Sequence, residues 1–103
     1  MDIGWIIEKV SKGEYEFRKH ALERGTLREI NPLEAKEAIL EGEVIEDYPD
    51  DPRGHSCLIH GKSSKGKQLH IVCGIAYDRV WVVTVYKPSK DEWINFKKRR
   101  KIK

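Results

Sequence analysis

The sequence contains little cysteine and no long apolar run. Two cysteines among 103 residues, Cys57 and Cys73, are too few for a disulfide framework. No apolar stretch approaches the ~18 residues of a membrane-spanning helix. The segment from Met1 to Val10 is amphipathic and includes acids, unlike a signal peptide. These absences predict a cytoplasmic protein that is not associated with a membrane.

Motifs of several common enzyme classes are also missing. The chain has no glycine-rich phosphate loop and no G-x-S-x-G sequence, which disfavours nucleotide hydrolysis and α/β-hydrolase chemistry. Residue types that bind zinc do gather in one stretch, at His55, Cys57, His60, His70 and Cys73. Their spacing gives no C-x-x-C pair and no H-x-x-x-H helix, and several would point to opposite faces of a strand. We therefore expect no metal and no cofactor.

What the sequence does contain is charge, and the charge is unevenly distributed. Charged residues make up 36% of the chain and hydrophobic residues 39%, as expected for one folded domain over residues 1–103. From Lys87 onward there are eight Lys or Arg and two acids, whereas the segment from Glu41 to Asp51 has six acids and no base. The molecule should therefore have an acidic edge and a basic end.

Three helices are expected in the first half of the chain. Apolar residues recur at the spacing of one helix face at Ile3, Ile6, Ile7 and Val10. A second helix is predicted over residues 14–24, with Gly25 as its C-cap. Asn31, Pro32 and Glu34 are typical of a helix start and predict a third helix that runs to Gly42.

The remainder predicts strands and a final helix. Strands are expected at residues 43–48, 57–61, 68–76 and 80–86. Residues 80–86 are apolar on both faces, so other strands should flank them on both sides. Residues 89–92 match a capping box and predict a basic C-terminal helix. The predicted class is α+β: N-terminal helices, a four-stranded mostly antiparallel sheet and that helix.

His20 and Arg24 are the first candidates for chemistry. They are spaced i and i+4 on the second predicted helix, so their side chains should project side by side. A titratable imidazole beside a permanent cation can bind phosphate or transfer a proton. The alternative is that both residues are half-exposed and pair with nearby acids such as Glu23 or Glu43.

His70 is the second candidate. It lies in an apolar strand and points away from Leu69, Ile71 and Cys73. The alternative is a structural histidine that is fully hydrogen-bonded. Thr84 and Tyr86 bring hydroxyl groups to the next predicted strand, but whether His70 shares their face depends on the turn near Asp78, because a slip of one residue reverses it.

The basic end is the third candidate. A cluster of cations closes the chain at Lys97, Lys98, Arg99, Arg100 and Lys101. Because Trp93 and Phe96 should anchor the preceding helix, this cluster would form a fixed patch that attracts nucleic-acid phosphates. The alternative is a solvated tail.

Several segments together resemble a known family. The shared positions are His20, Ala21, Arg24, residues 42–46, Tyr48, Pro49, Gly61, Leu69, His70, residues 84–86, Pro88 and Trp93. They are similar to an uncharacterised family of small prokaryotic proteins whose members look like RelE-like, BrnT-like and MqsR-like toxins. The likeness covers about residues 14–100. The helix over residues 1–12 is additional and would cover the sheet or mediate a homodimer.

This resemblance implies a RelE-like fold and a toxin of a type II toxin–antitoxin system. Such a toxin would cleave RNA without a metal, either free or on the ribosome, and leave 2′,3′-cyclic phosphate ends. Its partner would be a protein antitoxin, for which a zinc-ribbon protein is one candidate. The expected catalytic residues are His20, Arg24, His70 and Tyr86. A non-catalytic module that binds nucleic acid or protein through the same fold is the alternative.

Overall fold

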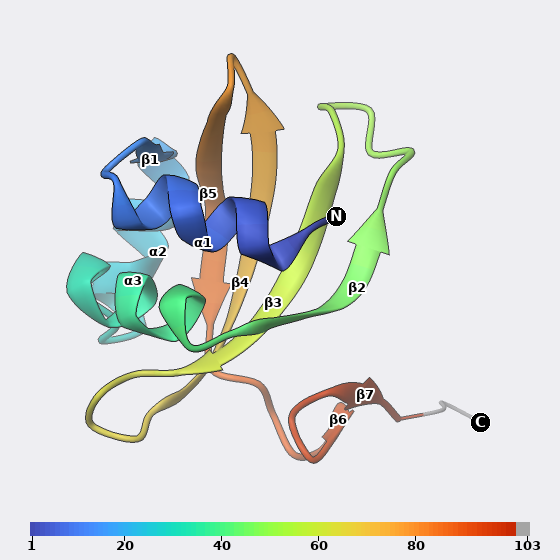
Figure 1. The fold of residues 1–103 in the computed structure, drawn as a ribbon. Coiled ribbons are helices and arrows are strands. Elements are labelled where there is room, and N and C mark those ends of the chain that lie inside the picture. The colour runs from blue at the N-terminus through green and yellow to red at the C-terminus, as the bar shows by residue number, and fades with distance from the viewer. Residues whose placement is uncertain (101–103) are drawn as a thin grey trace.

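The computed structural model describes residues 1–100 and consists of helices packed on a twisted sheet (Figure 1). The helices are α1 (Ile3–Ser11), α2 (Lys19–Leu27) and α3 (Pro32–Leu40). The sheet strands are β1 (Tyr15–Phe17), β2 (Glu43–Tyr48), β3 (Ser56–Lys62), β4 (Gln68–Ala76) and β5 (Arg79–Tyr86). A small separate hairpin consists of β6 (Trp93–Ile94) and β7 (Lys98–Arg99). The α+β class and the three N-terminal helices are confirmed.

The sheet has five strands in the order β1-β5-β4-β3-β2. All neighbours are antiparallel except β1, which runs parallel to β5. Residues 80–86 therefore lie between two strands, as their apolar character predicted. The expectation of four strands was wrong, because β1 makes the sheet five-stranded and mixed.

The fifth strand comes from a segment that was predicted to be helical. Tyr15 pairs with Val80 and Phe17 with Val82, and α2 begins only at Lys19. Aromatic residues favour a strand when a neighbouring strand offers its edge. The helix predicted over residues 14–24 is therefore shifted towards the C-terminus and preceded by a strand.

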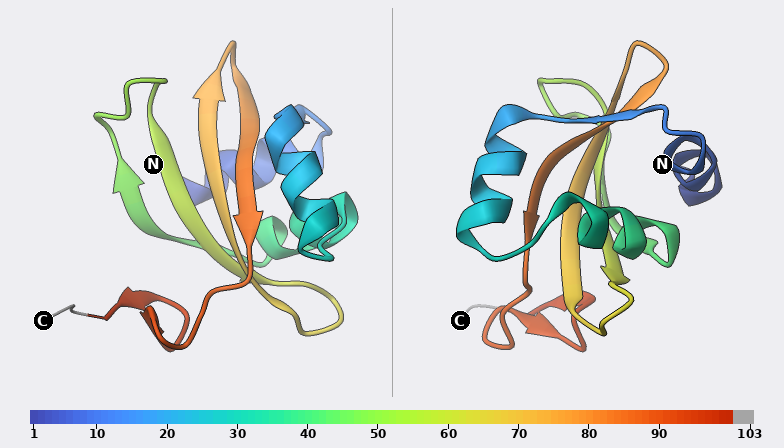
Figure 2. Two further views of the ribbon diagram at one scale, coloured as in Figure 1. Left: turned by 180° about the vertical axis from the view of Figure 1, so that it is seen from behind. Right: turned by 90° about the vertical axis from the view of Figure 1, so that its left-hand side faces the viewer.

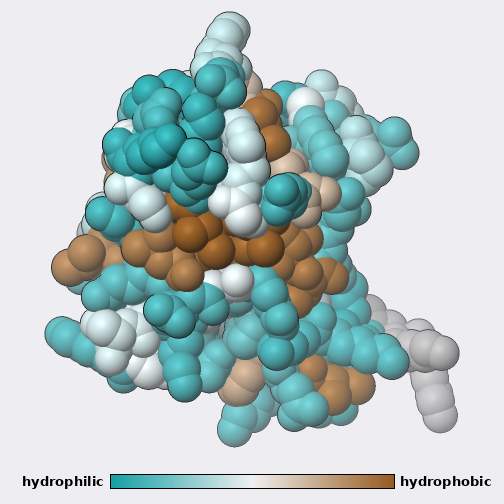
Figure 3. Space-filling model, in the orientation of Figure 1, coloured by the Kyte–Doolittle hydropathy of each residue, from teal (hydrophilic) through white to brown (hydrophobic). Residues whose placement is uncertain are grey.

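Helices α1 and α3 cover one face of the sheet, whereas α2 lies along its β5 side (Figure 2). The core between the helices and the sheet is apolar and includes Ile6, Ile39 and Ile71. A hydrophobic band crosses this side of the molecule in the region of α1 and α3 (Figure 3). The left view of Figure 2 shows the opposite face of the sheet, which α2 borders at the β5 side and no other helix covers.

A β-bulge decides which side chains reach the open face. Val72 pairs with Thr84 but Cys73 pairs with Val82, so Val83 is an extra residue in β5. Val82 and Val85 consequently both enter the core. Thr84 then faces the open side, and His70 pairs directly with Tyr86 on that same side.

The predicted basic C-terminal helix does not form. The side chain of Ser89 accepts a hydrogen bond from the Asp91 backbone, as a helix cap would, but the chain then turns back as the β6–β7 hairpin. Asn95 and Phe96 both adopt positive φ, the backbone of a tight hairpin turn. Burial of Trp93 at 4% exposure accompanies this turn and outweighs the helical pattern. We refer to residues 87–100 as the C-terminal strap.

Candidate nucleic-acid interface

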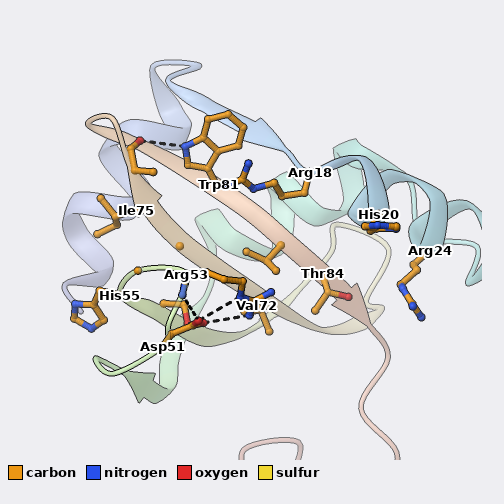
Figure 4. A pocket seen from close by; sticks show the side chains of 15 residues that line it. Arg18, His20, Arg24, Asp51, Arg53, His55, Val72, Ile75, Trp81 and Thr84 are labelled. Atoms are coloured by element: carbon orange, nitrogen blue, oxygen red, sulfur yellow. Dashed lines mark hydrogen bonds and ion pairs between the residues drawn. The ribbon is translucent and has the colours of Figure 1, made fainter.

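A pocket of about 540 Å³ opens on the face of the sheet opposite α1 and α3 (Figure 4). One wall is the N-terminal half of α2 with Arg18 before it, and the opposite wall is the loop between β2 and β3. The floor is formed by β4 and β5, including Val72, Val83 and Thr84. This volume lies within the range of small-molecule sites and suits a ligand of nucleotide size.

The lining of the pocket is strongly basic. It contains three arginines, two histidines and one acid: Arg18, Arg24, Arg53, His20, His55 and Asp51. The acid is already neutralised, because Arg53 donates to Asp51 through Nε at 3.2 Å and through a terminal nitrogen at 3.1 Å. The Arg53 side-chain and backbone hydrogen bonds, with one from Ser56, hold the pKa of Asp51 well below its usual range. A net positive field therefore faces the pocket.

The Arg18 side chain is held in place by stacking on Trp81. Its guanidinium lies 4.3 Å from the centre of the Trp81 ring, a cation–π contact. Its backbone N–H donates to the Val82 carbonyl and so continues the β1–β5 pairing. The indole N–H of Trp81 is held in turn by the Ala76 carbonyl at 3.1 Å. This cation and this aromatic ring are therefore preorganised beside the pocket.

His20 and Arg24 lie on the same pocket wall, as their spacing predicted (Figure 4). The His20 side chain is 81% exposed, and its Nδ1 lies 3.6 Å from the Glu23 carboxylate. Within residues 1–100, Arg24 has no carboxylate within 4.0 Å of its side chain, and Glu43 pairs with Lys97 instead. Arg24 therefore presents an uncompensated charge to a ligand.

His70 lies away from His20 and Arg24, outside the pocket lining. It is 0% exposed beneath the strap, with its ring 4.4 Å from that of Trp93. Its Nε2 donates to the Phe96 carbonyl, so the other nitrogen, Nδ1, accepts from the Tyr86 hydroxyl at 3.2 Å. Burial lowers the pKa of His70, which favours this neutral form. Both ring nitrogens are thus occupied within the fold.

The basic end is partly neutralised by the acidic edge. Lys97 lies 2.8 Å from Glu43, and Arg99 makes two contacts to Glu46 at 2.8 and 3.1 Å. Arg100 donates to the Lys90 carbonyl. Lys98 is exposed and free of ion pairs among residues 1–100, whereas Lys101 lies outside the described residues. Two of the five cations expected to contact nucleic acid therefore attach the strap to β2.

Four cationic or aromatic side chains of the pocket were not proposed as nucleic-acid ligands from the sequence: Arg18, Arg53, His55 and Trp81. Trp81 carried a signal, since it is the one aromatic residue inside a run of valines. His55 lies 2.6 Å from the Asp47 carboxylate, and this pair is formed only when the loop after β2 folds back. The positions of these four residues in the pocket depend on tertiary structure.

The zinc-ligand residue types do not converge. Among residues 1–100, no group of three or more His, Cys, Asp or Glu is arranged to hold a metal ion. Cys57 and Cys73 are free thiols opposite each other on β3 and β4, and burial raises the pKa of Cys57 to about 12. No helix in the described part of the chain has the length and apolar character needed to cross a membrane.

One comparison with known proteins gives a match. A family model described as a domain of unknown function (DUF4258) matches residues 17–87. No curated protein and no solved structure gives a significant match. The matched segment contains the pocket walls and floor, whereas α1 and almost all of the strap lie outside it.

Proposed function

The chain belongs to the DUF4258 family, and we propose that it is an RNA-cleaving toxin of the RelE-like kind whose substrate binds in the basic pocket. The observation that carries the proposal is the pocket lining, where three arginines and two histidines surround a floor next to a stacked tryptophan. Cations and aromatic rings side by side are the usual means of holding single-stranded nucleic acid.

The proposed reaction needs no metal. The ribose 2′-hydroxyl attacks the adjacent phosphorus, a 2′-O–P bond forms and the 5′-O–P bond breaks. His20 takes the 2′-hydroxyl proton as general base. His55 on the opposite wall, whose ring is oriented by Asp47, gives a proton to the leaving 5′ oxygen as general acid. Arg24 stabilises the charge on the phosphorane. The products are a 2′,3′-cyclic phosphate and a 5′-hydroxyl.

The catalytic roles expected for His70 and Tyr86 stay predictions. In the structure, the two side chains form a hydrogen bond with each other, and His70 also donates a hydrogen bond to the Phe96 carbonyl of the strap. In the proposed reaction, His20 and Arg24 therefore act from the open pocket without them.

The proposal includes a protein antitoxin as partner. Helices α2 and α3 expose Leu22, Leu27 and Leu33 at 44%, 83% and 62%, which is apolar surface that a partner can cover. Expression of the chain alone should slow growth, and the product of a neighbouring gene should relieve this and co-purify. Normal growth and normal yield of the chain alone would count against a toxin.

Cleavage is tested with purified protein and single-stranded RNA in EDTA. The wild type should leave 2′,3′-cyclic phosphate ends, and Arg24→Ala should lose about a hundredfold in rate through lost charge stabilisation. Lys19→Ala, an exposed cation on the same helix that does not line the pocket, is the matched control and should keep full activity. If the wild type binds RNA in a salt-sensitive manner but never cuts it, the chain is a binding module instead.

A further inference from the structure

The floor of the pocket continues under the strap. Val72 and Thr84 form a cross-strand pair in the pocket, and the next pair on the same face is His70 and Tyr86. His70 is fully buried there, whereas the pocket end of the face is open. Figure 2 shows the strap crossing this end of the sheet. One continuous surface is thus divided into an open half and a covered half.

The strap holds the covered half with contacts of the kinds that nucleic acid makes. Phe96 stacks on His60 with ring centres 6.0 Å apart and 12° between the planes. Trp93 meets His70 edge-on, and the Phe96 carbonyl accepts a hydrogen bond from His70. Stacked rings and a polar acceptor are also what a nucleobase offers to such a surface.

The strap is held by the buried Trp93 ring and by ion pairs that are accessible to solvent. Arg99 and Lys97 pair with Glu46 and Glu43 on β2, and the side chains of Arg99, Lys97 and Glu43 are more than half exposed. Exposed ion pairs are weak and are screened by salt. An independent observation is that the family match ends at residue 87, where the strap begins. Almost all of the strap thus lies beyond the matched segment.

We propose that the strap is an autoinhibitory cover over a second nucleotide subsite formed by His60, His70 and Tyr86. The identity of the ligand as RNA rests on the proposed function. A strand bound in the open pocket extends along the sheet face, displaces the strap and occupies this subsite. His70 and Tyr86 then contact the same RNA strand as His20 and Arg24.

The test reverses the charges that hold the strap. Lys97→Glu with Arg99→Glu places like charges opposite Glu43 and Glu46, and a melting curve establishes that the variant is folded. The control is Lys90→Glu with Lys98→Glu, which makes the same change in net charge at strap residues that have no carboxylate partner within residues 1–100. Both are assayed with a trinucleotide and a hexanucleotide of single-stranded RNA that carries 2′-O-methyl groups to prevent cleavage.

The expected result is a gain for the loosened variant with the longer strand only. It should bind the hexanucleotide about tenfold more tightly than the wild type despite its added negative charge, while the control binds more weakly. Diethyl pyrocarbonate should modify His70 in the loosened variant and leave it intact in the wild type. Equal losses of affinity in both variants, or a protected His70 in the loosened one, would overturn the proposal.

A second measurement uses the unmodified chain and does not depend on the fold of a variant. Hexanucleotide binding should speed trypsin cleavage between residues 97 and 100 several-fold, whereas the trinucleotide should not. Unchanged cleavage, with hexanucleotide binding that still requires Arg24, overturns the strap proposal and leaves the proposed function standing. Absence of any RNA binding by the wild type overturns both.

Discussion

Helix α3 and strand β3 approach each other closely at Gly61. A Cβ atom built on it would lie 1.8 Å from the Ala38 carbonyl oxygen, which is a backbone atom of α3 and cannot rotate away. Gly61→Ala should therefore force α3 from β3 and lower the free energy of unfolding by about 3 kcal/mol. Urea denaturation followed by circular dichroism measures this change.

Gly74 provides the matched control for that substitution. It also lies within a strand, but a Cβ atom there would meet its nearest neighbours at 3.7 to 4.0 Å, which is ordinary van der Waals distance. Gly74→Ala should change the unfolding free energy by less than about 1 kcal/mol. Equal losses for the two variants would show that the α3–β3 contact does not limit stability.

His70 makes the stability of the fold dependent on pH. Burial lowers its pKa below the ordinary value of about 6.5, although the hydrogen bond to the Phe96 carbonyl acts in the opposite direction. The charged neighbours that face it are His60 and Arg99, which lower the pKa, and Glu46, which raises it. The unfolded chain keeps the ordinary value, so it binds a proton at a higher pH than the folded chain does.

The contribution of His70 to the free energy of unfolding should accordingly be constant above pH ~6.5. The free energy should fall as the pH decreases below this value. His70→Gln retains one donor and one acceptor but cannot be protonated, so it should lose less stability between pH ~6.5 and ~5. Thermal melts across this range measure the difference between the two proteins. His20→Gln changes an exposed histidine, and its profile should follow that of the wild type. If His70→Gln also follows the wild-type profile, another group is responsible.

At the scale of elements, α3 depends on a reciprocal cap. The Asn31 side chain accepts from the Glu34 backbone N–H at 2.8 Å, and the Glu34 carboxylate accepts from the Asn31 N–H at 3.1 Å. Asn31→Ala leaves the first of these N–H groups without its partner and should destabilise the fold by about 1 kcal/mol. Asn31→Ser retains an acceptor and should lose only part of this in denaturant titrations. Equal stability of the alanine variant and the wild type would show that water replaces the cap without cost.

At the scale of the whole molecule, the distribution of charge predicts the salt dependence of RNA binding. Each phosphate neutralised on a single strand contributes about 0.7 to the slope of log affinity against log salt. Replacing both Arg18 and Arg24 with alanine should reduce that slope by about 1.4. Filter binding from low to moderate salt measures it.

Lys97→Ala is the control for this prediction, because its charge already pairs with Glu43. The slope for this variant should change by clearly less than it does for the double arginine variant. A larger effect from Lys97 would move the RNA contact from the pocket to the strap.

Local patterns in the sequence determined much of this protein. The i, i+4 spacing placed His20 and Arg24 on one wall, Asn31 with Pro32 started α3, and the valine-rich segment predicted a strand flanked on both sides. These features depend on helix and strand periods and on capping groups within a few residues, so each can be seen in a short window of sequence.

Only the tertiary structure decided the features that involve distant segments. The bulge at Val83 sets Thr84 and Tyr86 on the same face as His70, and no local pattern reveals an inserted residue when every neighbour is apolar. The strap does not form the helix that its capping pattern predicted. The reason is that Trp93 is buried and Arg99 pairs with Glu46 only in the folded molecule. Long-range burial and pairing outweigh local propensities, which differ by only about 1 kcal/mol per residue.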